Sequence, residues 1–538
     1  MMVRPARLTK IVFALLILML VQGIDLAQAA DNAEGEETPL RQTSIVINVT
    51  NYEWWLLRWS NSQLVCRIFI DHEGLPTLND IYYDCSESVY DAWVATKPCD
   101  SSLPELCSGL YLFYVGSAPS QSEILIDLPS AEVFVSLTGC SPTYPDNFCS
   151  TIPSLTFTAK EPLPNETITA VHVNVNGLLY DCPGEVCEVQ LRSTPLYGVP
   201  VEFWADSSFG DSSPHFTAQV RIIDSGVSAG GSGWYVDILS SQWVGAPVAS
   251  CAQIWQAFPP IGGPPDWLTT PETPALMETD IPYNYLAGRL IAQGLVNSSS
   301  CPGNGLLPNG YADACGLELA IPLVQEWQNQ FDLRIIEVAN ASGVPGQLIK
   351  NLFAQESQFW PGAFKDPKEF GLGQLTDNGA ETILLWNSTF FSQFCPLVLD
   401  AKACQKGYIY LSAEHQAILR GALAIQAKAD CEGCTAGIDL SNANFSIKLF
   451  AETLLANCEQ VAQVVYNATG QIPGETSNYE DLWRFTVANY HVGPGCLSYA
   501  MYTAWSAGAE MDWEHVSTYL TDACQSVIPY VEKVTTMP

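Results

Sequence analysis

The sequence predicts a multidomain protein in which all-β regions come first and a mostly helical region follows. In the first half, short segments rich in β-branched and aromatic residues alternate with clusters of Ser, Pro, Asn and Asp, which is typical of strands and turns. In the last part, apolar residues recur every three or four positions, which is the spacing of amphipathic helices. The 538 residues suffice for about three domains of ordinary size.

Residues 1–30 have the features of a cleaved secretory signal peptide. Three basic residues precede an apolar run from Ile11 to Val21, and Ala27-Gln28-Ala29 precedes an acidic stretch. The apolar run is shorter than the ~20 residues that a membrane-spanning helix needs, and no later stretch approaches that length. We therefore expect a secreted protein, extracellular or periplasmic and soluble after cleavage, with a retained N-terminal anchor as the alternative.

The first β region, residues 41–155, is expected to form an antiparallel sandwich or barrel. Its expected strands are Ser44–Val49, Leu64–Ile70, Leu110–Val115, Ile124–Leu128 and Val133–Leu137.

The second β region, residues 156–250, is expected to be a β-sandwich. Its expected strands are Val171–Val175, Val186–Leu191, Val199–Ala205, Thr217–Ile223 and Trp234–Leu239. Phe203–Asp211 (FWADSSFGD) is similar to the late strand and turn of immunoglobulin-like bacterial surface modules. We interpret both β regions as accessory domains, whose partner would be a cell-surface protein or carbohydrate.

Residues 251–310 are dense in Pro and Gly and are expected to form an extended linker. Residues 311–538 are expected to form the helical domain, with one helix along the stripe from Val324 to Val338. Further helices are expected at Glu414–Ala427, around Ile447–Val465 and at Tyr479–Tyr490.

The 18 cysteines all follow the expected signal peptide, and an even number in an exported chain indicates disulfides. Close spacing suggests the pairs Cys99 with Cys107, Cys140 with Cys149, and Cys182 with Cys187. The spacing of Cys431 and Cys434 matches half a zinc site, but no second half follows, so we expect no metal and no other cofactor.

Acidic residues dominate the charge, with 57 Asp and Glu against 22 Lys and Arg. Such a surface repels the phosphates of nucleic acids and anionic lipids, so we expect no nucleic-acid partner and no stable membrane insertion. Since 48% of the residues are hydrophobic, the composition is that of a folded chain rather than of a disordered acidic tail.

Glu356 occupies a position where the periodicity calls for an apolar residue. It follows Leu348 and Leu352 at intervals of four and precedes Phe359, so it is expected on the inner face of a helix that ends before Pro361. A carboxyl group that is partly removed from water keeps its proton to a higher pH, which suits a general acid. The alternative is a buried ion pair with Arg484 or Arg420.

A glycine-rich segment, Gly371-Leu372-Gly373-Gln374, begins ten residues after Pro361. Its glycines allow a ligand to approach the backbone closely, and Gln374 can both donate and accept hydrogen bonds. An ordinary turn is the alternative interpretation.

Four segments together carry a resemblance to a known family. In chain order they resemble the ESxFxPxA, GLMQ, AYNAGPG and YVxKV motifs of soluble lytic transglycosylase domains, which belong to the lysozyme-like superfamily and cut peptidoglycan. The segments are Ala354–Ala363 (AQESQFWPGA), Gly371–Leu375 (GLGQL), Ala488–Gly495 (ANYHVGPG) and Tyr530–Val534 (YVEKV). The resemblance covers roughly residues 320–534 and does not extend to the β regions.

The resemblance implies a lysozyme-like helical fold with Glu356 as the single acid and base. Glu356 would protonate the glycosidic oxygen between MurNAc and GlcNAc and then accept the proton of the attacking 6-hydroxyl, which gives a 1,6-anhydro sugar. Ser357 and Gln374 would position the glycan, and the backbone from Gly371 through Leu372 to Gly373 would line the groove. Tyr490 would bond Glu356 or the substrate, and His491 would line the site, although Tyr490 also fits a packing role and His491 a loop or cap role.

The chain departs from the family motifs at three places. His491 stands where Asn is usual, Gly373 where Met is common, and Thr376-Asp377 where a Pro is usual. The separation between Glu356 and Tyr490 is also longer than in the family, which indicates a cysteine-containing insertion that reshapes the cleft.

Two other functions fit the same residues. Glu369 or Asp377 as a second carboxylate would make the protein a hydrolytic muramidase. The departures at the motifs also fit a non-catalytic protein that binds the cell wall or mediates adhesion.

Overall fold

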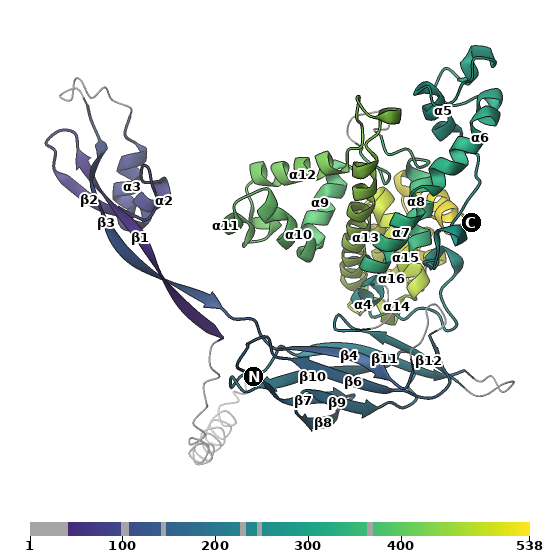
Figure 1. Cartoon of the computed structure of the whole chain (residues 1–538), viewed down its shortest axis with the longest axis horizontal. Helices are drawn as coiled ribbons and strands as arrows, with labels where there is room; N and C mark the ends of the chain where they lie inside the picture. Colours follow the sequence, from purple (N-terminus) through teal and green to yellow (C-terminus); the bar gives the residue numbers. More distant parts are fainter. Residues whose placement is uncertain are drawn as a thin grey trace, which may run out of the picture. The chain divides into compact units, whose positions relative to one another are not determined.

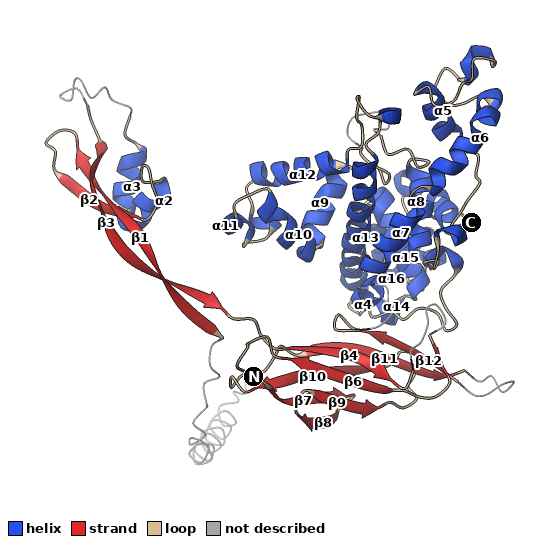
Figure 2. Cartoon of the chain, viewed as in Figure 1, coloured by secondary structure: helices blue, strands red, loops and turns tan. Residues whose placement is uncertain are grey.

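The computed structural model describes residues 41–97, 107–140, 147–225, 233–244, 250–362 and 369–537. Antiparallel sheets occupy the chain from Gln42 to Leu239, and a mostly helical region follows (Figure 1, Figure 2). This confirms the predicted fold class of β regions followed by a helical region. The expected signal peptide lies outside the described residues. Within the ranges given above, no helix combines the length and the apolar character needed to cross a membrane.

The first compact unit contains a three-stranded antiparallel sheet in the order β2-β1-β3 and two short helices. The elements are β1 (Gln42–Arg58), β2 (Leu64–Ile70), α2 (Leu78–Asp84), α3 (Glu87–Val94) and β3 (Leu110–Asp127). The expected strands Leu110–Val115 and Ile124–Leu128 are two ends of the single strand β3. Pro119 lies between them and pairs with Thr50, which is possible because β3 is an edge strand.

The second compact unit begins with a β-sandwich. One sheet has the order β4-β6-β9 and the other the order β5-β12-β11-β10-β7-β8. The strands are β4 (Glu132–Thr138), β5 (Phe148–Cys149), β6 (Ser154–Lys160), β7 (Ile168–Val175), β8 (Leu178–Pro183), β9 (Val186–Gln190), β10 (Val199–Ser207), β11 (Phe216–Asp224) and β12 (Trp234–Leu239). Both sheets contribute to one core, in which the rings of Phe157 and Phe203 lie 4.8 Å apart.

The sandwich begins earlier than the sequence indicated. Strand β4 was expected in the first β region, but it pairs along its whole length with β6, and Val133 and Val135 are buried in the sandwich core. The boundary between the β regions therefore lies before β4 rather than at residue 155. Of the expected disulfides, Cys140–Cys149 and Cys182–Cys187 are present, and Cys99 lies outside the described residues.

The helical region is built around the long helix α13 (Leu440–Thr469), which packs against α4, α7, α9, α12, α15 and α16 (Figure 1). The other helices are α4 (Ser250–Trp255), α5 (Asn284–Ala292), α6 (Ala314–Asn329), α7 (Asp332–Ser342), α8 (Gly346–Glu356), α9 (Asp377–Trp386), α10 (Ser388–Phe394), α11 (Ala401–Cys404), α12 (Ala413–Ala427), α14 (Pro473–Thr476), α15 (Tyr479–Val492), α16 (Pro494–Ser506), α17 (Trp513–Ser517) and α18 (Val527–Thr536). The single helix expected from Val324 to Val338 is two helices, α6 and α7, which are separated at Gln330 and Phe331.

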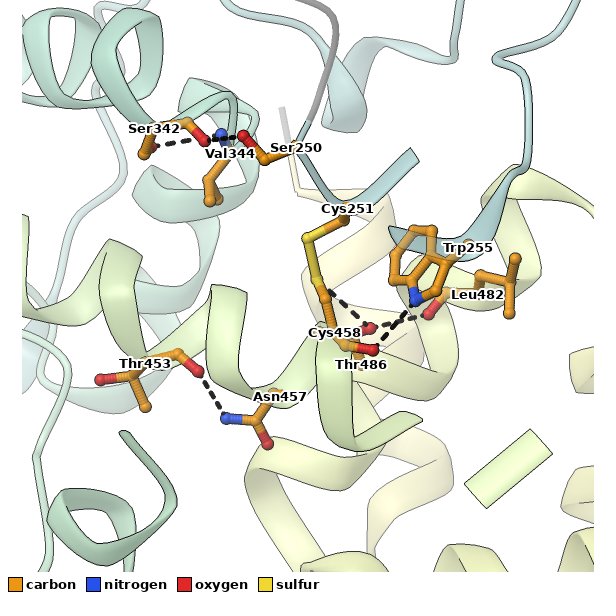
Figure 3. The surroundings of a disulfide bond; sticks show 10 residues. All are labelled: Ser250, Cys251, Trp255, Ser342, Val344, Thr453, Asn457, Cys458, Leu482 and Thr486. Atoms are coloured by element: carbon orange, nitrogen blue, oxygen red, sulfur yellow. Dashed lines mark hydrogen bonds between the residues drawn. A yellow bond between two sulfur atoms is a disulfide. The ribbon is translucent and has the colours of Figure 1, made fainter. Parts of the chain in front are cut away.

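Residues 251–310 do not form the extended linker that their Pro and Gly content predicted. They contain α4 and α5, and Trp255, Trp267 and Leu286 are buried in the same core as α13. Cys251 forms a disulfide with Cys458 of α13, and the indole nitrogen of Trp255 donates to the Cys458 carbonyl at 3.0 Å (Figure 3). Composition misled here because it does not register the few large apolar residues that anchor the segment.

Candidate active site

Helix α8 presents its apolar face to the core as the periodicity predicted. Leu348 and Leu352 are fully buried, and Glu356 on the same face is partly buried. The helix ends before Pro361 as predicted, but already at Glu356, because Gln358 and Phe359 adopt φ angles of 47° and 63°. The carboxyl group thus sits at the carboxyl end of a helix, where the helix dipole disfavours a negative charge.

The pKa of Glu356 is raised from 4.5 to about 7. Desolvation by burial is the main cause, and the negative charge of Glu369 raises the pKa further. The hydroxyl of Tyr530, in α18, donates a hydrogen bond to Glu356, which lowers the pKa and only partly offsets the burial. With this pKa, Glu356 is about half protonated at neutral pH and largely protonated in mildly acidic solution.

The two arginines considered as ion-pair partners of Glu356 bind other acids. Arg484 contacts Glu480 and lies 3.0 Å from Asp481, and Arg420 lies 3.0 Å from Asp377. The buried ion pair expected as the alternative is therefore not formed by these residues.

Tyr530 is the partner of Glu356 that the sequence did not identify. The motif resemblance included its segment but assigned it no role, and the two residues are 174 positions apart. Asn351 of α8 donates to the carbonyl of Val534 at 2.8 Å, which fixes α18 beside α8. The His491 ring stacks on the Tyr530 ring at 3.9 Å and 12° and so holds the phenol in place.

The glycine-rich segment is held tightly against helices α8, α13 and α15. The Ser357 hydroxyl donates to the Leu372 carbonyl at 2.7 Å, and the Tyr490 hydroxyl donates to the Gly373 carbonyl. Gly371 has a φ of 74°, and a Cβ at Gly373 would lie 2.0 Å from the Phe450 ring. A side chain at position 373 would therefore collide with the Phe450 ring.

The predicted site residues therefore divide into two groups. Ser357, Gly371, Leu372 and Gly373 are buried and join the loop to its neighbours, whereas Gln374, Tyr490 and His491 line a cleft together with Glu356. Tyr490 was expected to bond Glu356 or the substrate, and its hydroxyl bonds the loop instead of Glu356.

The cleft has a volume of about 640 Å³ and is bounded by three parts of the helical region. Helix α9 contributes Asn378, Glu381 and Trp386, helix α13 contributes Thr453, Asn457 and Gln460, and the end of α15 contributes Asn489, Tyr490 and His491. Helix α9 lies in the segment between Glu356 and Tyr490, and together with α10 to α12 it has an apolar core of its own and the disulfide Cys395–Cys404. One wall of the cleft therefore comes from a segment in which no motif was recognisable.

Amide side chains connect two walls of the cleft. The Asn489 amide nitrogen donates to Asn457 at 2.7 Å and to Gln460 at 2.8 Å, which joins α15 to α13. Neither Asn457 nor Gln460 was expected at the site, because an amide on a buried helix face gives no signal in a single sequence.

The charge of the cleft is negative. Glu356, Glu369 and Glu381 line it, and no Lys or Arg does so within the part of the chain that the structure describes. The pKa of His491 is lowered by desolvation, which favours the uncharged ring, and burial keeps the pKa of Tyr490 and Tyr530 well above the usual value. Asp377, the other candidate for a second carboxylate, pairs with Arg420 and does not line the cleft.

No family model matches the chain, and neither the curated proteins nor the solved structures include one that matches it.

Proposed function

We propose that the chain is an exported lytic transglycosylase that cleaves the β-1,4 bond between MurNAc and GlcNAc in peptidoglycan. The observation that carries the proposal is the partly buried Glu356 carboxyl group, which has a raised pKa, lies at the end of α8 and lines a cleft of about 640 Å³. The many disulfides fit an oxidising compartment, such as the cell exterior or the periplasm.

In the proposed reaction Glu356 acts first as an acid and then as a base. Its proton passes to the glycosidic oxygen as the bond to the anomeric carbon breaks. The 6-hydroxyl oxygen of the same sugar bonds the anomeric carbon, and its proton passes to the Glu356 carboxylate. The products are a 1,6-anhydro end and a free 4-hydroxyl, and the enzyme returns to its starting state.

A hydrolytic muramidase is the second candidate, and Glu369 is the observation that favours it. This carboxylate lines the same cleft and is close enough to Glu356 to raise its pKa. A second carboxylate orients water or forms a covalent intermediate in hydrolytic glycosidases.

Digestion of purified sacculi tests both candidates. Wild-type protein is expected to release muropeptides with anhydro ends, identified by mass spectrometry, and Glu356→Gln is expected to release none. Glu514→Gln, on an exposed position of α17 away from the cleft, is the control and should behave as wild type. Reducing ends would favour the muramidase, and binding to sacculi without any release would favour a non-catalytic wall-binding protein.

A further inference from the structure

The cleft around Glu356 contains more negative charge than a single acid and base requires. Glu356 itself is largely neutral in mildly acidic solution, but Glu369, which precedes the glycine-rich loop, and Glu381, in α9, add two further carboxyl groups to the cleft. Within the described residues, none of the side chains that line the cleft is a Lys or Arg. The whole chain is negatively charged as well, with a formal net charge of −35.

Two buried side chains of the cleft each hold an acceptor atom that lacks a donor among the described residues: Gln374 Oε1 and Asn489 Oδ1. Gln374 is 5% exposed and Asn489 is 2% exposed. Their orientations are fixed, because the Gln374 amide nitrogen donates to the Gly371 carbonyl at 2.8 Å and the Asn489 nitrogen donates to Asn457 and Gln460. Unpaired acceptors beside carboxylates favour a ligand that brings hydrogen-bond donors.

We propose that the glycan preferred by this cleft carries free amino groups, as in β-1,4-linked strands that contain N-deacetylated glucosamine. This inference rests on the proposed function and names the substrate class of the same site. An ammonium group supplies positive charge and three donors, whereas an N-acetyl group supplies one donor and no charge. A hydrogen bond between charged groups in a partly desolvated cleft is stronger than one between neutral groups.

The same charges act against anionic strands. Carboxylates on a wall polymer meet repulsion both from the cleft and from the net charge of the protein. Removal of acetyl groups from the sugars offsets that repulsion at the positions where Glu369 and Glu381 line the cleft. The acidity of the protein is then part of its substrate selection.

Binding without turnover tests the inference. Glu356→Gln protein is titrated calorimetrically with two hexasaccharides of equal linkage, one of glucosamine and one of N-acetylglucosamine, at a pH where the amines are protonated. The glucosamine oligomer should bind about tenfold more tightly or better, and high salt should narrow the difference. Adding Glu369→Gln and Glu381→Gln to this protein should remove most of the preference, whereas adding Glu514→Gln should leave it intact.

Each outcome separates the inference from the proposed function. Equal binding of both sugars, or tighter binding of the acetylated one, would overturn the amino-group preference and leave the glycan-cleaving function standing. A preference that survives loss of Glu369 and Glu381 would also overturn it. Failure of both sugars to bind would overturn the amino-group preference as well, and the digestion of sacculi would then decide the glycan-cleaving function separately.

Discussion

At the scale of single residues, the chemistry depends on the balance of forces at Glu356. Burial and the neighbouring Glu369 raise its pKa, while the hydrogen bond from Tyr530 lowers it, and the result is a pKa of about 7. An acid with a pKa near the working pH is protonated often enough to donate and is basic enough to recover a proton. Tyr530 therefore tunes the acid rather than only packing beside it.

Tyr530→Phe should shift the pH dependence of glycan cleavage. Loss of the donated hydrogen bond removes stabilisation of the ionised carboxylate, so the pKa of Glu356 rises and the decline of kcat at high pH moves to a higher pH. The pH profile of kcat measures this shift. Tyr499→Phe, at an exposed position of α16, is the control and should leave the profile in place. A profile that stays in place or moves to lower pH in Tyr530→Phe would contradict the assigned role.

Glu356→Gln should stabilise the protein at high pH. The pKa of Glu356 is raised from 4.5 in the unfolded chain to about 7 in the fold. Below pH 4.5 the carboxyl group is protonated in both states and does not affect stability. As the pH rises from 4.5 to about 7 the wild type loses stability, and above that range it loses no more. The neutral amide avoids this loss and keeps an acceptor for Tyr530. Unfolding of both proteins is followed by helical circular dichroism. The free energy of unfolding of the variant should exceed that of the wild type by roughly 1–3 kcal/mol at pH 8 and should differ little from it at pH 4. Equal stability of the two proteins at pH 8 would mean that the carboxylate is well solvated.

The sequence predicted the inward direction of Glu356 because apolar periodicity specifies a helix face. It did not predict Tyr530 as the partner, since periodicity says nothing about which distant helix covers that face. The resemblance led us to expect Ser357 and the glycines at the substrate, and the structure shows in addition that they join the loop to α8, α13 and α15.

At the scale of elements, the glycine-rich loop and α13 fit together through one close contact. The ring of Phe450 in α13 occupies the space that a side chain at Gly373 would need, and it also packs edge-on against Tyr490 at 5.4 Å. The loop, α13 and α15 are thus packed together beside the cleft.

Gly373→Ala should destabilise the helical region by about 1–3 kcal/mol, because the new Cβ would overlap the Phe450 ring. The control is Gly421→Ala in α12, where a Cβ meets nothing within 4 Å and alanine favours the helix. Denaturant unfolding followed by helical circular dichroism compares the two variants. A Gly373→Ala protein as stable as the wild type would show that Phe450 moves aside at no cost.

Helix prediction succeeded where periodicity is sustained over many residues, as in α12, α13 and α15. It failed at ends and breaks, such as the end of α8 at Glu356 and the separation of α6 from α7. At the end of α8, the hydroxyl of the next residue, Ser357, donates to the carbonyl of the distant Leu372, a contact that helical periodicity does not report. The strand β3 was likewise divided in the prediction because clusters of Ser, Pro, Asn and Asp were interpreted as turns, although an edge strand accommodates Pro119.

At the scale of the whole molecule, the segment that precedes the helical domain in sequence is part of its core. Cys251 of α4 is joined to Cys458 of α13 across 207 positions, and Cys458 is adjacent to the cleft residue Asn457 (Figure 3). Composition assigned this segment to a linker, and only the tertiary structure revealed its buried aromatic anchors.

Replacement of Cys251 and Cys458 by Ala should cost much more stability than replacement of Cys431 and Cys434. The Cys251–Cys458 disulfide closes a loop of 207 positions, and its removal should lower the free energy of unfolding by about 5 kcal/mol, because the unfolded chain is no longer restrained. The Cys431–Cys434 disulfide closes a loop of 3 positions, and its removal should lower that free energy by about 1.5 kcal/mol. Thermal unfolding of the two double variants provides the comparison. If the variant without Cys251 and Cys458 loses no more stability than the variant without Cys431 and Cys434, the unfolded chain between Cys251 and Cys458 is already restrained by other means.

If Glu356 is the acid that cleaves a glycan, kcat for one soluble peptidoglycan strand, measured from acid to alkaline pH in wild type and Glu356→Gln, should reveal it. We expect wild-type turnover that declines as the pH rises through about 7, and no turnover by the variant at any pH. Turnover by Glu356→Gln comparable with that of the wild type would contradict this expectation.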